Sequence, residues 1–551
     1  MMPKFLYMIK NKKITKEQVM KDIIAGIIVA VIALPLSIAL GISSGVSPEK
    51  GLITAIFAGF IISFLGGSRV QIGGPTGAFV IIIYSIIQDY GLNGLITATI
   101  MAGLILIIMG VLRFGSLIKY IPQTITIGFT SGIAITLMST QIKDFFGLKI
   151  ENVPAEFFTK WGSYFGNMRS LNTWSLIIGL GSIIIIAFWP KINKTIPGSM
   201  VALIVATLSV KLLNLPVETI GSRFQEISST IPIPLFPVFS METINKLFAP
   251  AMTIAILAAL ESLLSAVVAD GMISDTHDSN MELIAQGIAN VTSGLFGGIP
   301  ATGAIARTAA NVKSGGKSPI AGMVHAITLL ATMLILMPLA KMIPMSVLAA
   351  ILMVVSYNMS EWRVFESLLK APKSDVIVLL ITFVCTIIFD LVVAIGIGMI
   401  MAMFLFIKRV SDTTEIRDLV EEEVFDEEIS KVLEKVDGKI HIYQVNGPIF
   451  FGIVQEFISK MKELESSVEV VILDMRHTHA IDASAIDALS RLLKNCNKFG
   501  IRLCLTHVQE QPMKVLDKMG FVIKVGRSNI YDTKTEAIEK AYDYIKHLEV
   551  S

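Results

Sequence analysis

The sequence predicts an α-helical polytopic membrane protein whose 14 transmembrane segments form a seven-plus-seven inverted repeat, followed by an α/β domain. The first observation is composition: over 551 residues the chain is 53% hydrophobic and 16% charged, with a mean hydropathy of +0.70. The second is that almost all long apolar runs fall between about Asp22 and Arg409. The third is that two short sequence motifs recur at nearly the same offset.

The apolar part divides into two series of predicted helices. The first series is 22–42, 50–66, 76–88, 93–112, 118–139, 172–189 and 196–213, and the second is 249–270, 281–297, 302–313, 319–337, 344–357, 374–390 and 391–408. The segments 76–88 and 302–313 are too short to cross a bilayer alone, so we interpret them as half-helices. The predicted domains are a cytoplasmic start (1–21), a transporter domain (22–409, with repeats at about 22–213 and 249–409), a charged linker (410–437) and a terminal domain (438–551).

The recurring motifs indicate that the second series repeats the first. Pro75-Thr76-Gly77-Ala78 resembles Pro300-Ala301-Thr302-Gly303-Ala304, and Lys119-Tyr120-Ile121-Pro122 resembles Lys341-Met342-Ile343-Pro344. The offsets nearly agree (300 − 75 = 225 and 344 − 122 = 222). An odd number of spans per repeat makes the second copy inverted, and broken helices at matching positions point to a transporter's binding site.

The charge pattern predicts the orientation in the membrane. Six lysines precede or flank the start of the first span without a small-residue cleavage site after it, so we expect an uncleaved first helix with a cytoplasmic N-terminus. An even number of spans then places the C-terminal domain in the cytoplasm too, and the chain in the inner (plasma) membrane. The aromatic, amphipathic segment 143–173 is expected to lie along the outer membrane face.

The C-terminal part alternates between strand and helix patterns. We expect strands at 440–445, 468–475 and 502–506, and helices at 452–464, 483–499, 511–519 and 533–547, after a solvated acidic linker or helix. Ser484 follows a buried strand at the start of a helix, where a capping role is the simplest interpretation.

The most informative stretch runs from Gly297 to Asn311, with a second copy at 73–78. Irregular backbone at membrane depth survives only where protein buries it or where it lines a wet cavity. Two half-helix starts facing one cavity would direct free N–H groups at an anion, and Arg307 would add a full positive charge. The candidate substrate-binding residues are Thr76, Gly77, Ala78, Thr302, Gly303, Ala306 and Arg307. The two threonine hydroxyls could bind substrate oxygen or cap the helices, and Arg307 could instead pair with a carboxylate such as Glu261.

Glu261 lies in the middle of an apolar span, where an ionised carboxylate is costly unless it is paired or protonated. Glu261 is therefore a candidate proton carrier. Ser265 is one turn further on the same face, so a sodium site that uses both side chains is the functional alternative. The purely structural alternative is a hydrogen bond from Glu261 to a neighbouring helix. In the first span, Leu36 and Leu40 are expected to form cavity wall.

Several function classes are excluded by what the sequence lacks. No Walker A, HExxH or CxxC motif is present, so we expect neither an enzyme, nor a metal site, nor a cofactor. The net charge of +2, without a basic stripe and interleaved aromatics, argues against nucleic acid as a partner.

These residues give the chain a resemblance to the SulP family of anion transporters, the solute carrier 26 group in animals. The resemblance lies in Gln71-Ile72-Gly73-Gly74-Pro75-Thr76-Gly77-Ala78, in Ala306-Arg307-Thr308 and in Ser314-Gly315-Gly316-Lys317-Ser318, and the tail resembles a STAS domain. It implies core and gate domains that move against each other, substrate between the third and tenth helices, and a homodimer. It also implies that Ser484 occupies the position phosphorylated in related anti-sigma-factor antagonists. Glu261 is similar to members that couple to protons, whereas the bicarbonate subgroup with a sodium site has Asp there.

The predicted function is secondary active transport of a small oxyanion, sulfate or bicarbonate with a dicarboxylate third, by proton-coupled symport. Sodium-coupled bicarbonate symport and anion exchange remain alternatives. A nucleobase carrier of the same fold would need aromatic or amide groups at the half-helices, and their Gly/Ala/Thr lining offers none. A membrane sensor signalling through the terminal domain is the alternative from another class. Deleting the residues after Arg409 would separate the two, because a transporter should retain some flux.

Overall fold

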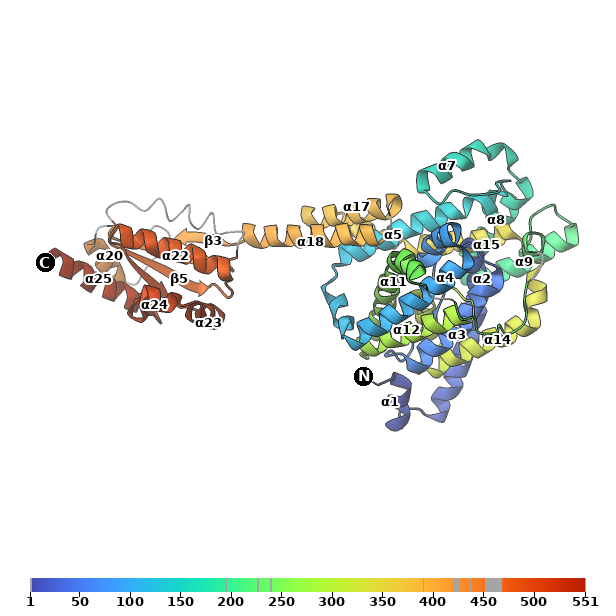
Figure 1. Ribbon diagram of the computed structural model, residues 1–551, viewed down its shortest axis with the longest axis horizontal. Coiled ribbons are helices and arrows are strands. Elements are labelled where there is room, and N and C mark those ends of the chain that lie inside the picture. Colours follow the sequence, from blue (N-terminus) through green and yellow to red (C-terminus); the bar gives the residue numbers. More distant parts are fainter. Residues whose placement is uncertain are drawn as a thin grey trace. The chain divides into compact units, whose positions relative to one another are not determined.

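The computed structural model describes residues 2–193, 196–224, 227–237, 240–389, 391–419, 427–436, 438–450 and 468–550. The chain forms two compact units, Met1–Met399 and Ile400–Ser551, which are considered separately below. Figure 1 shows the helices of the first unit and the sheet of the second.

The first unit is built of helices that follow the predicted segments closely. Its elements before the second half of the repeat are α1 (Lys4–Lys10), α2 (Lys16–Ser43), α3 (Pro48–Leu65), β1 (Gly73–Gly74), η1 (Gly77–Phe79), α4 (Val80–Val111), η2 (Phe114–Tyr120), α5 (Gln123–Thr140), α6 (Ile142–Phe146), α7 (Phe157–Gly166), η3 (Met168–Ser170), α8 (Thr173–Ile192), α9 (Gly198–Leu213) and α10 (Ile220–Arg223). Then follow α11 (Met241–Ile273), α12 (Ser279–Leu295), β2 (Thr302–Gly303), α13 (Ile305–Lys313), α14 (Ile320–Ala340), α15 (Met345–Met359), α16 (Trp362–Leu368), α17 (Lys373–Ile388) and α18 (Leu391–Asp412).

The predicted break inside α4 is present. Gly91 has non-helical angles (φ 68°, ψ −174°) in the middle of this helix, and a positive φ costs glycine less than any other residue. The half-helix 76–88 and the span 93–112 therefore meet at Gly91. Nine helices in the described part of the chain are long and apolar enough to cross a membrane, so the count of 14 spans stays a prediction.

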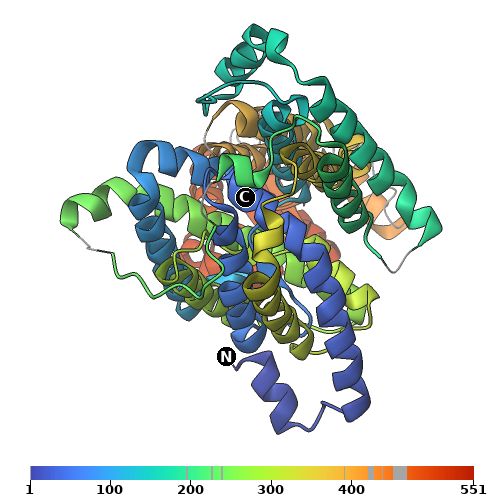
Figure 2. The ribbon, with the colours of Figure 1, turned by 90° about the vertical axis from the view of Figure 1, so that its right-hand side faces the viewer.

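The helices of the first unit pack in two groups (Figures 1 and 2). In one group α4 packs against α11 and α12, and α14 packs against α2 and α3. In the other, α5 packs against α15 and α17, and α8 packs against α9 and α15. The second sequence motif marks corresponding points of the latter group, because Pro122 is the N-cap of α5 and Pro344 that of α15. A proline there costs no hydrogen bond, since the first N–H groups of a helix lack intrahelical acceptors.

The second unit is a five-stranded sheet in the order β3-β4-β5-β6-β7. The strands are β3 (Glu415–Asp418), β4 (Ile440–Asn446), β5 (Val470–His477), β6 (Arg502–Thr506) and β7 (Ile530–Tyr531), with β3 antiparallel to β4 and the others parallel. The helices α22 (Ala483–Lys498), α23 (Glu510–Lys518) and α24 (Phe521–Val525) pack in one apolar core, and α20 (Glu427–Lys435) and α25 (Lys534–Val550) in another.

Two expectations for the second unit need correction. The segment 410–437 is not only a linker, because β3 pairs with β4 and α20 packs against α25. Ser484 does not cap α22: the N-cap is Asp482, whose carboxylate accepts from Ala485 N at 2.9 Å. An acidic N-cap is also favoured by the helix dipole. The predicted helix 452–464 and the acidic residues 421–423 and 426 lie outside the described residues.

Candidate functional site

The site forms where the two half-helix starts meet. β1 pairs antiparallel with β2, with Gly73 opposite Gly303 and Gly74 opposite Thr302. Each short strand leads directly into a helix start, η1 with α4 on one side and α13 on the other. Neither η1 nor α13 has a side-chain cap. The first turns therefore present N–H groups of the kind that binds anions at helix starts.

Glycine permits this pairing because there is no room for a side chain. A Cβ at Gly303 would lie 1.5 Å from Gln71 Nε2, and one at Gly73 would lie 2.2 Å from Ile62 Cδ1. Contacts below 3.0 Å force a neighbour to move. Gly73 and Gly303 therefore leave the room that the side chains of Ile62 and Gln71 occupy beside the β1–β2 pairing.

Substituting Gly74 by alanine is expected to disrupt the site. Gly74 has a φ of +150°, and its Cβ would lie 2.5 Å from Arg307 Nη1, so the methyl group would displace the guanidinium. We expect the variant to lose anion binding at least about tenfold, the effect of a free-energy change of about 1.4 kcal/mol. Gly181→Ala is the matched control, since a Cβ at Gly181 meets nothing within 4 Å. Equal binding by the two variants would show that the position of the guanidinium is unimportant.

Arg307 is buried at the meeting point, with 2% of its surface exposed. Its Nη2 donates to the carbonyl oxygen of Pro75, which immediately precedes the first half-helix. Its Nε and Nη1 are buried without a hydrogen-bond partner. Arg307 and Glu261 form no ion pair within 4.0 Å, so the carboxylate does not neutralise the guanidinium directly. Two guanidinium nitrogens, Nε and Nη1, thus keep their N–H groups available to an acceptor that enters the site.

Glu261 and Ser265 lie on α11 beside the two half-helices. The Thr76 side chain and the Arg307 charge both act on the Glu261 carboxylate, although Thr76 Oγ1 makes no hydrogen bond of full geometry. Ser265 is fully buried and donates to Thr308 Oγ1 at 3.3 Å. Ser265 thereby connects α11 to α13, which is the structural role that the sequence left open.

The remaining predicted residues divide between the site and its surroundings. Thr302 donates to Ala258 O at 2.9 Å, and the N-cap of α13 is Ala304, so Thr302 is not the cap. Ala306 is exposed and Thr76 half-buried, whereas the other motif residues Gly77, Ala78 and Gly303 are buried. Leu36 and Leu40 belong to an apolar cluster that also contains Val80 at the start of α4, and their role as cavity wall stays a prediction.

Two features of the site were missed from the sequence. The first is a buried polar network: Glu282 accepts from Gly67 N (2.8 Å), Ser68 N (3.2 Å) and Gln286 Nε2 (2.9 Å). The second is His325 on α14, which is fully buried with neither ring nitrogen hydrogen-bonded and within electrostatic range of Arg307. A histidine inside an apolar span is the signal that could have identified it.

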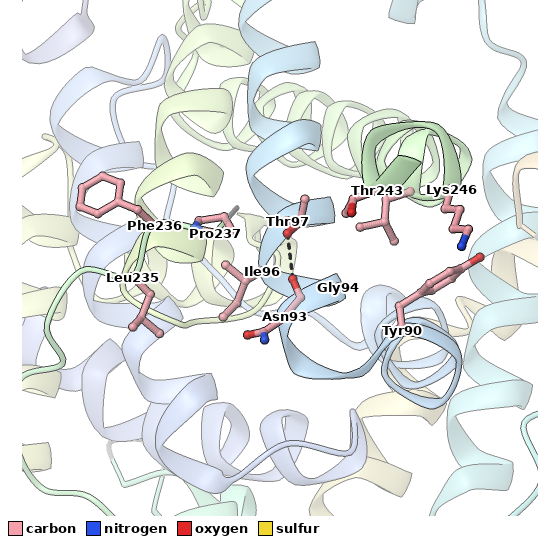
Figure 3. A pocket seen from close by; sticks show the side chains of 11 residues that line it. Tyr90, Asn93, Gly94, Ile96, Thr97, Leu235, Phe236, Pro237, Thr243 and Lys246 are labelled. Atoms are coloured by element: carbon pink, nitrogen blue, oxygen red, sulfur yellow. Dashed lines mark hydrogen bonds between the residues drawn. The ribbon is translucent and has the colours of Figure 1, made fainter. Parts of the chain in front are cut away.

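A cavity elsewhere in the first unit has a different character (Figure 3). It measures about 520 Å³ and is lined by α4, α11 and the segment 235–237. Its lysine, Lys246, is exposed and pairs with Glu242 at 2.7 Å. Thr97 donates to the carbonyl of Asn93 at 2.9 Å, as Figure 3 shows. Lys246 is therefore already neutralised, which distinguishes this cavity from the site around Arg307.

Comparison with known proteins identifies the family of the chain. The model of the sulfate permease family matches residues 19–382, and that of the STAS domain matches residues 431–537. The chain belongs to the sulfate permease family. Members of this family that resemble it include "Putative sulfate transporter YvdB" of Bacillus subtilis, 38% identical over 524 residues (94% of this chain and 97% of the relative). The bicarbonate transporter BicA of Synechocystis is 30% identical over 515 residues (89% and 88%).

Solved structures give the same fold. The transmembrane domain of a cyanobacterial BicA matches this sulfate permease family member with a TM-score of 0.62 and 30% identity, over 71% of this chain and 98% of that one. SLC26A9 matches with a TM-score of 0.85 and 20% identity, over 98% and 92%, which shows the fold alone. The protein is thus a multi-pass member of an anion-transporter family with a C-terminal STAS domain, and its relatives are transporters rather than enzymes.

Proposed function

We propose that the protein is a proton-coupled symporter of a small oxyanion, sulfate or bicarbonate, with a dicarboxylate as the third candidate. The observation that carries the proposal is the pair of unpartnered Arg307 N–H groups between two uncapped helix starts. Each helix start contributes about half a unit of positive charge. The sum favours an anion with several acceptor oxygens over a neutral or cationic substrate.

The coupling ion is proposed from Glu261. A lone carboxylate on a membrane helix is most stable when protonated or paired, and Glu261 has no ion pair within 4.0 Å to Arg307. Protonation of Glu261 would remove a negative charge beside the anion and allow the loaded core to move. A sodium ion held by Glu261 and Ser265 is the alternative, because the Ser265 hydroxyl donates its hydrogen to Thr308 and keeps its lone pairs for a cation.

We propose an elevator-like movement in which the helices around α13 shift against the group formed by α5, α8, α9, α15 and α17. The half-helix pairing would travel as one body, because the β1–β2 bonds hold both starts together.

We further propose a homodimer in the plasma membrane with both termini and the STAS domain in the cytoplasm. Ser484, half-buried in the first turn of α22, remains the regulatory candidate.

The direct test is anion uptake by proteoliposomes that contain the purified full-length protein. Sulfate, bicarbonate and fumarate are supplied in turn, with an inward proton gradient, an inward sodium gradient or neither, at clamped membrane potential. We expect one oxyanion to accumulate only under the proton gradient. Accumulation driven by sodium alone would replace the proton by sodium in the proposal. Equal uptake under all three conditions would indicate exchange or a channel-like path.

A further inference from the structure

A second cluster of cations lies away from Arg307, around the short helix α7. A cavity of about 270 Å³ opens there between α2, α4, α6, α7 and α10. Its charged lining residues are Lys143, Asp144, Glu151, Lys160 and Arg223. In both views α7 and α1 lie at opposite edges of the first unit (Figures 1 and 2). The predicted topology places α7 on the outer side of the membrane.

The carboxylates that face this cavity are largely engaged. Arg223 forms two bonds to Asp144, at 2.6 and 3.1 Å, and two to Glu218, at 2.5 and 2.9 Å. Glu151 is exposed. One guanidinium with two carboxylates carries a charge of −1, which the half-buried Lys143 balances. Glu151 supplies the remaining negative charge of the lining but is exposed, and no carboxylate in the described ranges forms an ion pair with the Lys160 ammonium.

Lys160 is unusually deep for an unpaired lysine. Only 4% of its surface is exposed, and its side chain has no salt bridge or hydrogen bond to any residue in the described ranges. Tyr164, one turn further on the same face of α7, is 1% exposed, and its hydroxyl lacks a hydrogen-bond partner. Buried donors almost always have acceptors, so the Tyr164 hydroxyl is exceptional, and the Lys160 ammonium faces the cavity without a protein acceptor.

We infer that the cavity beside Lys160 binds a small inorganic oxyanion from the outer medium, at a site separate from the one around Arg307. The anion would accept from Lys160, which lines the cavity together with Lys143, while Tyr164 lies one turn behind Lys160 on α7. No residue that lines this cavity belongs to the half-helix motifs. The inference rests on the proposed function only in the choice of sulfate as the first probe.

The cavity is also closed on the side of α4. The Tyr84 hydroxyl donates to Val153 O at 2.8 Å and so attaches the loop that covers Lys160 to α4. The cavity is therefore walled by α2 and α4 on one side and by the end of α5 at Thr140, α6, α7 and α10 on the other. An anion bound here would touch both groups of helices that the proposed transport cycle moves apart, so we expect it to slow uptake at high external anion concentration.

The test is equilibrium binding of radiolabelled sulfate, and separately of bicarbonate, to the purified full-length protein. The wild type should bind two anions per chain, Lys160→Gln should weaken one of them at least tenfold, and Tyr164→Phe should weaken the same one less. The control is Lys149→Gln, because Lys149 is exposed and does not line the cavity. Arg307→Ala should retain the outer anion whatever happens to transport, which separates this inference from the proposed function.

Binding should also depend on pH in a defined direction. Burial lowers the pKa of Lys160 to about 8, so the ammonium that attracts the anion is present at pH 7 and is largely lost at pH 9. The titratable or charged groups that face it are Tyr84 on α4, Lys143 and Asp144 on α6, Glu151 in the loop, Tyr164 on α7 and Arg223 on α10. We expect outer-site affinity to fall between pH 7 and 9 in the wild type and to be flat in Lys160→Gln.

Two results would overturn the inference. One is a single anion per chain in the wild type that Arg307→Ala abolishes and Lys160→Gln leaves unchanged. The other is bound lipid phosphorus that co-purifies with the wild type but not with Lys160→Gln, because a lipid headgroup would then be the occupant. Melting temperatures measured without anion exclude misfolding: a variant that melts like the wild type but does not bind has lost the site alone.

Discussion

Replacing Arg307 by alanine is expected to remove central-site anion binding and uptake together. The guanidinium supplies the full positive charge of the site, and its Nε and Nη1 have no acceptor in the protein. Truncating one partner of a buried, hydrogen-bonded charge pair costs about 2–5 kcal/mol, which corresponds to at least about a 30-fold rise in Kd at about 1.4 kcal/mol per factor of ten. Sulfate and bicarbonate uptake by proteoliposomes, with binding measured on the same preparations, checks the expectation.

Two variants distinguish the charge from the geometry of the guanidinium. Arg307→Lys retains the positive charge but loses the planar guanidinium group. In the wild type, one nitrogen of that group donates to Pro75 O while Nε and Nη1 have no partner in the protein. We expect intermediate affinity. Arg113→Ala removes an exposed arginine of the same unit and should leave uptake unchanged. Full uptake by a folded Arg307→Ala protein would exclude the central site as the transport site.

The helix boundaries were predictable because composition determines them. The bilayer requires long apolar stretches, and glycine and proline interrupt them where the chain must bend, as at Gly91 and at Pro122 and Pro344. The short half-helices were recognised by the same reasoning, since the apolar run before α13 ends at a Gly/Pro cluster. The parallel strands β4, β5 and β6 followed from their period-two and continuous apolar patterns.

The partners of the buried polar groups could not be predicted, because they depend on pairing across more than 200 residues. Arg307 bonds to the carbonyl of Pro75 rather than to the nearer carboxylate in sequence, Glu261. The antiparallel pairing of β1 with β2 involves two residues on each side, too few to leave a strand pattern. β3 was missed for a related reason: its four residues are mostly polar, and only its contact with β4 makes it a strand.

The electrostatics of the site depend on the hydrogen bond between Arg307 and the distant Pro75 carbonyl. Had Arg307 met Glu261 directly, the two charges would have cancelled and the site would have offered an anion little beyond two helix starts. Because the guanidinium bonds to an uncharged carbonyl, its charge persists, and the carboxylate remains free to change its protonation state. Under the proposed symport, anion binding and proton binding would be coupled through the electrostatic interaction between Glu261 on α11 and Arg307 on α13.

Glu261→Gln is expected to uncouple transport from the proton gradient. Glutamine resembles the protonated carboxyl group in shape and charge, so the anion should still bind and exchange across the membrane. Each proton that moves with the anion can support about tenfold accumulation per pH unit, since one pH unit corresponds to about 1.4 kcal/mol. The wild type should therefore accumulate its anion about tenfold under a gradient of one pH unit at zero membrane potential, whereas Glu261→Gln should only equilibrate.

The matched control is Glu49→Gln, because Glu49 is another buried carboxylate in the same unit but accepts from Ser47 at the start of α3, away from Arg307. This variant should accumulate anion like the wild type.

Ser265→Ala tests the sodium alternative. If sodium drives uptake through Glu261 and Ser265, Glu261→Gln and Ser265→Ala both lose sodium stimulation. Proton coupling instead predicts that uptake by Ser265→Ala keeps its response to pH. Undiminished proton-driven accumulation by Glu261→Gln would assign coupling to another buried group, and His325, unpartnered on α14 within electrostatic range of Arg307, would be the next to substitute.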